Sequence, residues 1–145
     1  MAERIVTITV GQNGRLTAID HRKVKAVLGD EIVWKFRGPR GNHWIGIGDF
    51  REYATGNAKN PTTKEPYSID PADPAGEARA TVKGSHEAQG HYRYRIVSIG
   101  LPRMRRLTSR MHAPRAFAAQ AEYVLKVMMA QDADSELDPE VQIGG

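Results

Sequence analysis

Histidine, methionine and arginine are the residues of this sequence whose positions suggest a functional site. The chain contains no cysteine. The absence of cysteine excludes disulfides, thiolate metal sites and cysteine nucleophiles. His43 and His91 are the candidate metal ligands, and histidine with methionine near a tryptophan such as Trp44 suits Cu(I). No regular His or Met spacing supports a metal motif, so a structural role is the simpler interpretation for both histidines. The methionines that could take part are Met104, Met111, Met128 and Met129.

No arrangement of residues points to catalysis. Ser85, His86 and Glu87 are neighbours in sequence, whereas a nucleophile, its base and the orienting acid are usually brought together from distant positions. The glycines form no phosphate-binding pattern after a predicted strand. We therefore expect a protein that is not an enzyme and that uses no cofactor.

The most unusual segment, Leu101–Arg115, contains arginines and no acid, whereas residues 132–140 contain five acids and no base. The simplest interpretation is that the two segments pair, within the molecule or across a dimer. Arginine and methionine are also enriched where proteins meet, so a protein partner or self-assembly is the leading expectation. The candidate partner-binding residues are Trp44, Arg103, Arg105, Arg106, Arg110 and Arg115.

Nucleic acid is the alternative partner. Tyr92 and Tyr94 alternate with Arg93 and Arg95, and aromatic residues interleaved with arginines can stack on unpaired bases. RNA or single-stranded DNA could then bind across the arginines of residues 93–115. The net charge of +4 is modest, so composition alone does not favour this alternative.

Short strands must position these residues. Ile32, Trp34 and Phe36 alternate with polar or smaller residues, which predicts a half-buried strand that carries two large aromatics into a core. Tyr92–Val97 shows the clearest alternation in the chain. The strand His43–Ile47 begins at the rim of a loop, with Trp44 on the side opposite to its isoleucines.

Further strands are predicted at Arg4–Val10, Arg15–Ile19, Val24–Val27 and Glu77–Val82, with a short edge strand within Leu137–Ile143. An Asn-Gly pair predicts a hairpin between the first two. Seven or so short strands with turn signals between them indicate an all-β sandwich or barrel.

Two stretches give weaker signals. Gly48–Gly76 contains little regular pattern and is predicted to be a long functional or disordered loop. Residues 114–131 satisfy both a helical and a strand pattern. We place a short helix near Pro114–Ala121 and a strand at about Glu122–Met129, and both alternatives stay open.

This succession of strands resembles the cupredoxin-like family. The matching pieces lie within about Arg4–Ser98 and are Val24–Val27, Gly29–Phe36, His43–Ile47 and Gly90–Tyr94. The resemblance implies a Greek-key β-sandwich. Blue-copper members of the family hold the metal with a His, then a Cys, a second His and usually a Met. His43 matches the first histidine, but Arg95–Pro102 contains neither Cys nor His, so the resemblance implies a domain without the blue-copper site.

At 145 residues the chain is predicted to form a single domain, with a core at 4–98, a basic insertion at 101–119 and C-terminal strands at 122–143. No apolar run approaches the roughly 20 residues that span a bilayer. Ile5–Val10 is too short for a secretory signal, so we expect a cytoplasmic protein without a membrane partner. The leading hypothesis is a metal-free interaction or assembly module. The alternatives are a cysteine-free copper-binding protein that uses His43 and a nucleic-acid binder.

Overall fold

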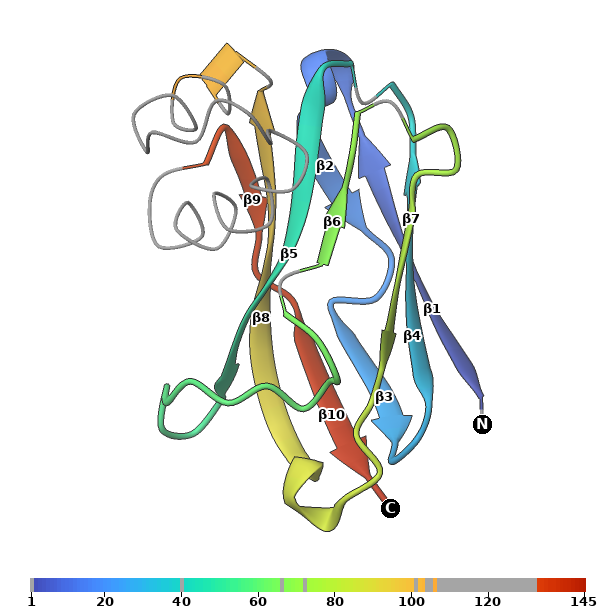
Figure 1. Ribbon diagram of the computed structural model, residues 1–145, viewed down its shortest axis with the longest axis vertical. Coiled ribbons are helices and arrows are strands. Elements are labelled where there is room, and N and C mark those ends of the chain that lie inside the picture. Colours follow the sequence, from blue (N-terminus) through green and yellow to red (C-terminus); the bar gives the residue numbers. More distant parts are fainter. Residues whose placement is uncertain are drawn as a thin grey trace.

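Two β-sheets make up the computed structural model, which describes residues 2–39, 41–65, 67–71, 73–100, 102–103, 106 and 133–145. The labels of Figure 1 are used throughout. Two 3-10 turns, η1 (Gln12–Gly14) and η2 (His86–Ala88), connect strands. The strands are β1 (Glu3–Val10), β2 (Leu16–Ile19), β3 (Lys23–Val27), β4 (Glu31–Arg37), β5 (His43–Glu52), β6 (Tyr67–Ile69), β7 (Glu77–Thr81), β8 (Gly90–Gly100), β9 (Ser135–Leu137) and β10 (Glu140–Gly144).

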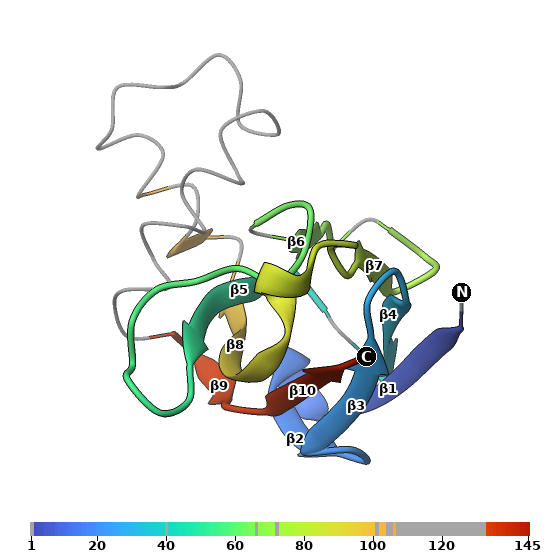
Figure 2. The same cartoon turned by 90° about the horizontal axis from the view of Figure 1, so that it is seen from below.

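The first sheet has the order β2-β1-β4-β7, and the second has the order β3-β10-β8-β5-β6, with β9 also paired to β8. The chain changes sheet repeatedly between β2 and β8, as Greek-key connections do. Figure 2 shows β5 and β8 on one side of the molecule and β1, β4 and β7 on the other. The all-β, two-sheet sandwich predicted from the sequence is confirmed.

The core lies between the sheets and is centred on aromatic side chains from both. The indole Nε1 of Trp34, on β4, donates a hydrogen bond of 3.0 Å to the hydroxyl of Tyr94, on β8. Phe50 stacks on Tyr94 with ring centroids 5.1 Å apart. All three side chains are at most 1% exposed. Burial raises the pKa of Tyr94 well above its ordinary value of 10.0, so the hydroxyl stays protonated. The tryptophan-bearing strand β4 and the tyrosine-bearing strand β8 therefore meet across the core.

Asp30 is a buried carboxylate that ties the start of the chain to the turn between β3 and β4. It accepts hydrogen bonds from the backbone N–H groups of Ala2 and Val27 at 3.1 and 3.0 Å. The Nε of Arg4 donates a third bond at 3.0 Å. Burial by itself would raise the pKa of Asp30, but these donors outweigh it and hold the pKa below the ordinary value of 3.8.

The C-terminal strand does not lie at a sheet edge, and that prediction is wrong. β10 runs parallel to β3 on one side and antiparallel to β8 on the other. Pro139 lies between β9 and β10, where its missing N–H removes no ladder bond, and its carbonyl accepts a hydrogen bond of 3.1 Å from the Tyr94 N–H. Because Pro139 precedes β10 and is not part of it, β10 can pair with a neighbouring strand on each side.

The prediction of a long irregular loop over Gly48–Gly76 is also wrong in part. β5 continues to Glu52, and β6 pairs with β5 within this stretch. Isolated bridges join Arg51 to Ala58 and Thr62 to Val82. The predicted helix near Pro114–Ala121, the predicted strand Glu122–Met129 and most of the basic insertion lie outside the described residues. Within the described part of the chain, no helix is long and apolar enough to cross a membrane.

Candidate functional site

The two candidate metal ligands lie at opposite ends of the second sheet. His43 is paired with Gly100 at one end of the β5–β8 ladder, and His91 precedes the Tyr92–Glu52 pair at the other. Nearly the whole of β5 separates them, which is about 30 Å at the rise of an extended strand. His43 and His91 therefore cannot hold the same metal ion.

His43 belongs to a small charged cluster centred on Asp134. The Nε2 atom of His43 lies 3.9 Å from an Asp134 oxygen, which also accepts a hydrogen bond of 2.7 Å from the Gly100 N–H. The other Asp134 oxygen is paired with Arg103 at 3.2 Å. The His43 Nδ1 atom is buried and makes no hydrogen bond within the described part of the chain.

These residues do not fit a copper centre. Among the residues that the structure describes, no group of three or more His, Cys, Asp or Glu side chains could hold a metal ion. A guanidinium is held in the same cluster, where it would repel a cation, and no thiolate exists in the chain. Copper binding through His43 stays a prediction, which would need methionines that lie outside the described residues.

His91 has a structural role at the other end of the sheet. Its Nε2 atom lies 2.5 Å from Oε1 of Glu140 on β10. The ring of Tyr53 stacks on the imidazole with centroids 4.2 Å apart, and the Tyr53 N–H donates to the His91 carbonyl. His91 therefore joins the end of β5 to β8 and β10.

The acidic run of residues 132–140 pairs with basic groups of the same chain in its described part. Asp134 pairs with Arg103, and Glu136 pairs with Arg95. The Arg103–Asp134 pair joins the basic segment to the acidic run, as the charge pattern suggested, whereas Arg95 lies on β8 outside the basic segment. Arg106 is exposed, whereas Arg105, Arg110 and Arg115 lie outside the described residues.

Trp44 was predicted to contact a partner, but its side chain is buried. Only 5% of Trp44 is exposed, and its pairing partner Ile99 on β8 is fully buried. A partner-binding role for Trp44 stays a prediction that would require its surroundings to open.

The alternation of tyrosine and arginine along β8 separates the two residue types onto opposite faces. Tyr92 and Tyr94 point into the core and are 1% exposed, so neither can stack on a base. Arg93 and Arg95 lie on the outer face of the sheet, where they line a pocket of about 330 Å³. Tyr92 and Tyr94 therefore do not support the nucleic-acid hypothesis. The residues that line the pocket are Asp49, Arg51, Arg93, Tyr94, Arg95 and Asp138.

A β-bulge in β5 places Asp49 and Arg51 at this pocket. Ile45 and Ile47 point inward, so regular alternation would bury Asp49; instead, the register shifts between Gly48 and Arg51, and Phe50 points inward. Asp49 adopts a φ of 54°, a left-handed conformation that aspartate tolerates better than most residues. The break in apolar spacing from Ile47 to Phe50 was the sequence signal for this bulge, and our reading of the sequence missed it.

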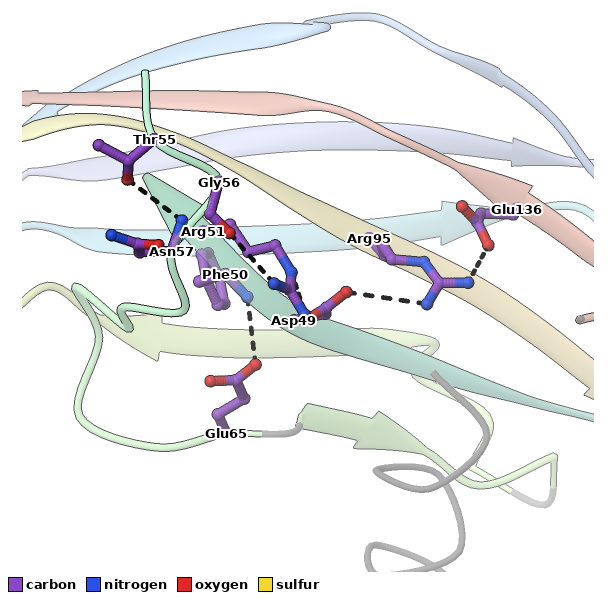
Figure 3. A network of polar contacts seen from close by, with 9 residues as sticks. All are labelled: Asp49, Phe50, Arg51, Thr55, Gly56, Asn57, Glu65, Arg95 and Glu136. Atoms are coloured by element: carbon purple, nitrogen blue, oxygen red, sulfur yellow. Dashed lines mark hydrogen bonds and ion pairs between the residues drawn. The ribbon is translucent and has the colours of Figure 1, made fainter. Parts of the chain in front are cut away.

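Asp49 holds two arginines in place (Figure 3). One carboxylate oxygen accepts a hydrogen bond of 3.1 Å from the Arg51 Nε, and the other lies 3.8 Å from the Arg95 guanidinium. Arg95 is also paired with Glu136 on β9, and its side chain is only 19% exposed. These acids raise the pKa of Arg95, chiefly through the hydrogen bond to Glu136. The arginine is thus charged and held in one orientation.

Comparison with known proteins adds little to this geometry. No protein-family model and no curated protein matches the chain. The solved structures that match include a reduced Cu(I) form of an amicyanin mutant at pH 4, with 10% identity and a TM-score of 0.35. The match covers 95% of this chain and 80% of that one. A likeness at this level carries no argument about function. The strands themselves define a two-sheet β-sandwich, and membership of the cupredoxin-like family stays a prediction.

Proposed function

We propose that the chain is a non-enzymatic interaction or assembly module that binds a protein partner through the outer face of β5 and β8. The observation that carries this proposal is the set of outward-facing arginines on these two adjacent strands, gathered around one pocket. Arg51 comes from β5, and Arg93 and Arg95 come from β8. Arginine is enriched both at protein interfaces and among the residues that contribute most to binding.

The rigidity of this face supports the proposal. β5 and β8 are paired along most of their length and are anchored from behind by the aromatic core. Arg95 is further restrained by Asp49 and Glu136. Side chains that are ordered before a partner arrives lose less conformational entropy on binding, so the face is suited to a specific contact.

The face also adjoins the Gly48–Gly76 stretch and the start of the basic insertion. Gly48–Gly76 contributes Asp49, Arg51 and the Gly56 turn to the pocket or its rim. The basic insertion begins directly after β8, where Arg103 is paired with Asp134. A partner that covered the pocket could therefore reach both segments.

The test compares three forms of the full chain: the wild type, the double variant Arg51→Ser/Arg93→Ser and the control Arg79→Ser. Arg79 is an exposed arginine on β7 in the opposite sheet, where it is paired with Glu31 and Glu77. Each form is used to capture partners from an extract of the source organism, and the complex is sized by light scattering.

We expect wild type and Arg79→Ser to form the same stoichiometric complex, with a partner or with a second copy, and the double variant to lose it. A monomeric wild type that captures no stoichiometric partner would contradict the proposal. So would a double variant that assembles as the wild type does.

A further inference from the structure

We propose that the pocket on the outer face of β5 and β8 binds a single carboxylate of an acidic peptide segment, clasped between the guanidinium groups of Arg51 and Arg93. This inference rests on the proposed function, because it names the chemical group by which that face would recognise a protein partner. It assigns a ligand class to residues that neither the fold nor the core requires.

Arg51 and Arg93 are direct cross-strand neighbours in the antiparallel β5–β8 ladder. Side chains in such positions have Cβ atoms about 5 Å apart, and like charges facing each other there destabilise a sheet. An anion between the two guanidinium groups removes this repulsion. A carboxylate bound between Arg51 and Arg93 is therefore attracted by both guanidinium groups.

The arginines of the pocket differ in how far their charge is already compensated. Arg51 is paired with Asp49, and Arg95 with both Asp49 and Glu136. The Arg93 side chain makes no ion pair or hydrogen bond with any residue that the structure describes, and it is exposed. One guanidinium is thus left to bind an incoming anion.

Both guanidinium groups lie beside Gly56. Its carbonyl accepts a hydrogen bond of 3.1 Å from Nη1 of Arg51. A Cβ atom added to Gly56 would lie 3.6 Å from Nη2 of Arg93, and the φ of +74° at this position favours glycine. The turn therefore lies directly beside Arg93, and the positive φ, not a lack of space, is what favours glycine there. Guanidinium forks match the geometry of a carboxylate and form short, charge-assisted hydrogen bonds with it.

The charge of the pocket favours a single carboxylate over nucleic acid. Asp49 and Asp138 line the pocket together with the arginines, and Glu136 is paired at its rim. These acids repel a densely charged phosphate backbone, whose binding typically rests on several phosphate contacts. The charge of Arg93 has no partner among the described residues, and it balances the charge of one carboxylate.

Asp138 makes the pocket sensitive to pH. Burial and its neighbour Glu136 raise the pKa of Asp138 to about 6. Protonation of Asp138 as the pH falls from 7.5 to 5.5 removes a negative charge from the pocket, whereas a glutamate ligand, with a pKa of about 4.3, stays ionised. Carboxylate binding should therefore strengthen over this range. The charged groups that face Asp138 or share its pocket are Glu136 on β9, Arg22 before β3, Arg93 and Arg95 on β8, and Asp49 and Arg51 on β5.

The experiment titrates the full chain with an amidated tetraglutamate peptide and follows the side-chain Nε–H signals of arginine by NMR. The matched probes are tetraglutamine, inorganic phosphate and an oligothymidine strand. The variants are Arg93→Ser, Asp138→Asn and the opposite-sheet control Arg79→Ser, and thermal unfolding checks that each is folded.

We expect tetraglutamate to shift the Arg51 and Arg93 signals and tetraglutamine to leave them unchanged. Arg93→Ser should weaken binding by more than about tenfold, because a hydrogen bond to a charged group is lost. Arg79→Ser should bind as the wild type does, and Asp138→Asn should flatten the rise in affinity between pH 7.5 and 5.5. Unchanged arginine signals, equal binding of tetraglutamine, or preference for phosphate or oligothymidine would overturn the inference.

The two proposals fail separately. A captured partner whose binding needs Arg51 and Arg93, together with no response to tetraglutamate, would overturn the carboxylate inference and leave the interaction module standing. Tetraglutamate binding without any captured partner or self-assembly would leave the pocket standing and count against the module.

Discussion

Both faces of β8 carry side chains with polar partners, but the inner face is buried and the outer face borders solvent. On the inner face, Tyr94 shares a single hydrogen bond with Trp34, and water does not reach either group. On the outer face, Arg95 is paired with two acids at the edge of an open pocket. The inner bond joins the two sheets, whereas the outer pairs join neighbouring strands of one sheet.

This difference separates the groups on which stability depends from the groups that we propose bind a partner. A buried polar group that loses its partner costs about 1–3 kcal/mol, whereas an exposed ion pair contributes about 0–1 kcal/mol. Substitutions on the inner face should therefore lower the free energy of unfolding more than substitutions on the outer face. The outer face should lose its charges without losing the fold, as the proposed binding role requires.

The largest effect is expected for Trp34→Ala. The side chain is fully buried between the sheets and contacts the rings of Tyr67 and Tyr94. Its removal should lower the free energy of unfolding by about 3–5 kcal/mol, through lost burial and the cavity that remains. Urea unfolding followed by circular dichroism measures the change. A loss below about 1 kcal/mol would mean that the inner face does not dominate stability.

Asp30→Ala should have the second largest effect, because it leaves the N–H groups of Ala2 and Val27 without their acceptor. We expect a loss of about 2–4 kcal/mol at pH 7. The pKa of Asp30 is lower in the folded chain than the ordinary value of 3.8. The stabilisation is therefore present above pH 3.8 and is lost as the pH falls through the folded pKa. Urea titrations from pH 7 downward should show the difference between wild type and variant begin to narrow below pH 3.8, and a difference that stays constant through acid unfolding would contradict this account.

Tyr94→Phe should have a smaller effect, because it keeps the ring and removes only the hydroxyl that accepts from Trp34. The indole N–H is then buried without that acceptor, which should cost about 1–2 kcal/mol. The loss should be smaller in the background of Trp34→Phe, where no indole N–H remains to be satisfied. A double-mutant cycle measures this coupling, and strictly additive losses would show that the bond across the sheets contributes nothing.

Arg93→Ser should have the smallest effect on stability, within about 0.5 kcal/mol, because the side chain is exposed and forms no ion pair with the described residues.

Glu136→Gln should cost more than Arg93→Ser, up to about 1 kcal/mol, and this loss should shrink in high salt because the substitution removes the partner of Arg95. Thermal unfolding at low and high salt measures both. A large loss in Arg93→Ser would mean that the outer face supports the fold and would weaken its assignment to recognition.

Local patterns along the chain predicted most of the strands and, outside the bulge of β5, the direction of their side chains. The alternation in β4 and β8 assigned Trp34 and Tyr94 to the core and Arg93 and Arg95 to the surface. The Asn-Gly turn predicted the first hairpin, in which Asn13 and Gly14 have φ values of 62° and 71°. Such signals are readable because side-chain direction in a strand depends only on the residue's own position.

The candidate site was only half predictable. Arg93 and Arg95 were singled out because they alternate with Tyr92 and Tyr94, although those tyrosines belong to the core. Asp49 and Arg51 were not predicted to belong to a site, and Asp138 was noted only as part of the acidic run of residues 132–140. Nothing close to them in the sequence shows that β5, β8 and the β9–β10 junction meet.

The sequence by itself determined that the protein is built of short strands around buried aromatics and that it has no thiolate chemistry, since both follow from residue type and alternation. The tertiary structure alone decided that the last strand lies inside the second sheet and that Arg51 faces Arg93. The physical reason is that strand order and register arise from contacts between distant segments. The pocket that those contacts create is a property of the assembled sheet.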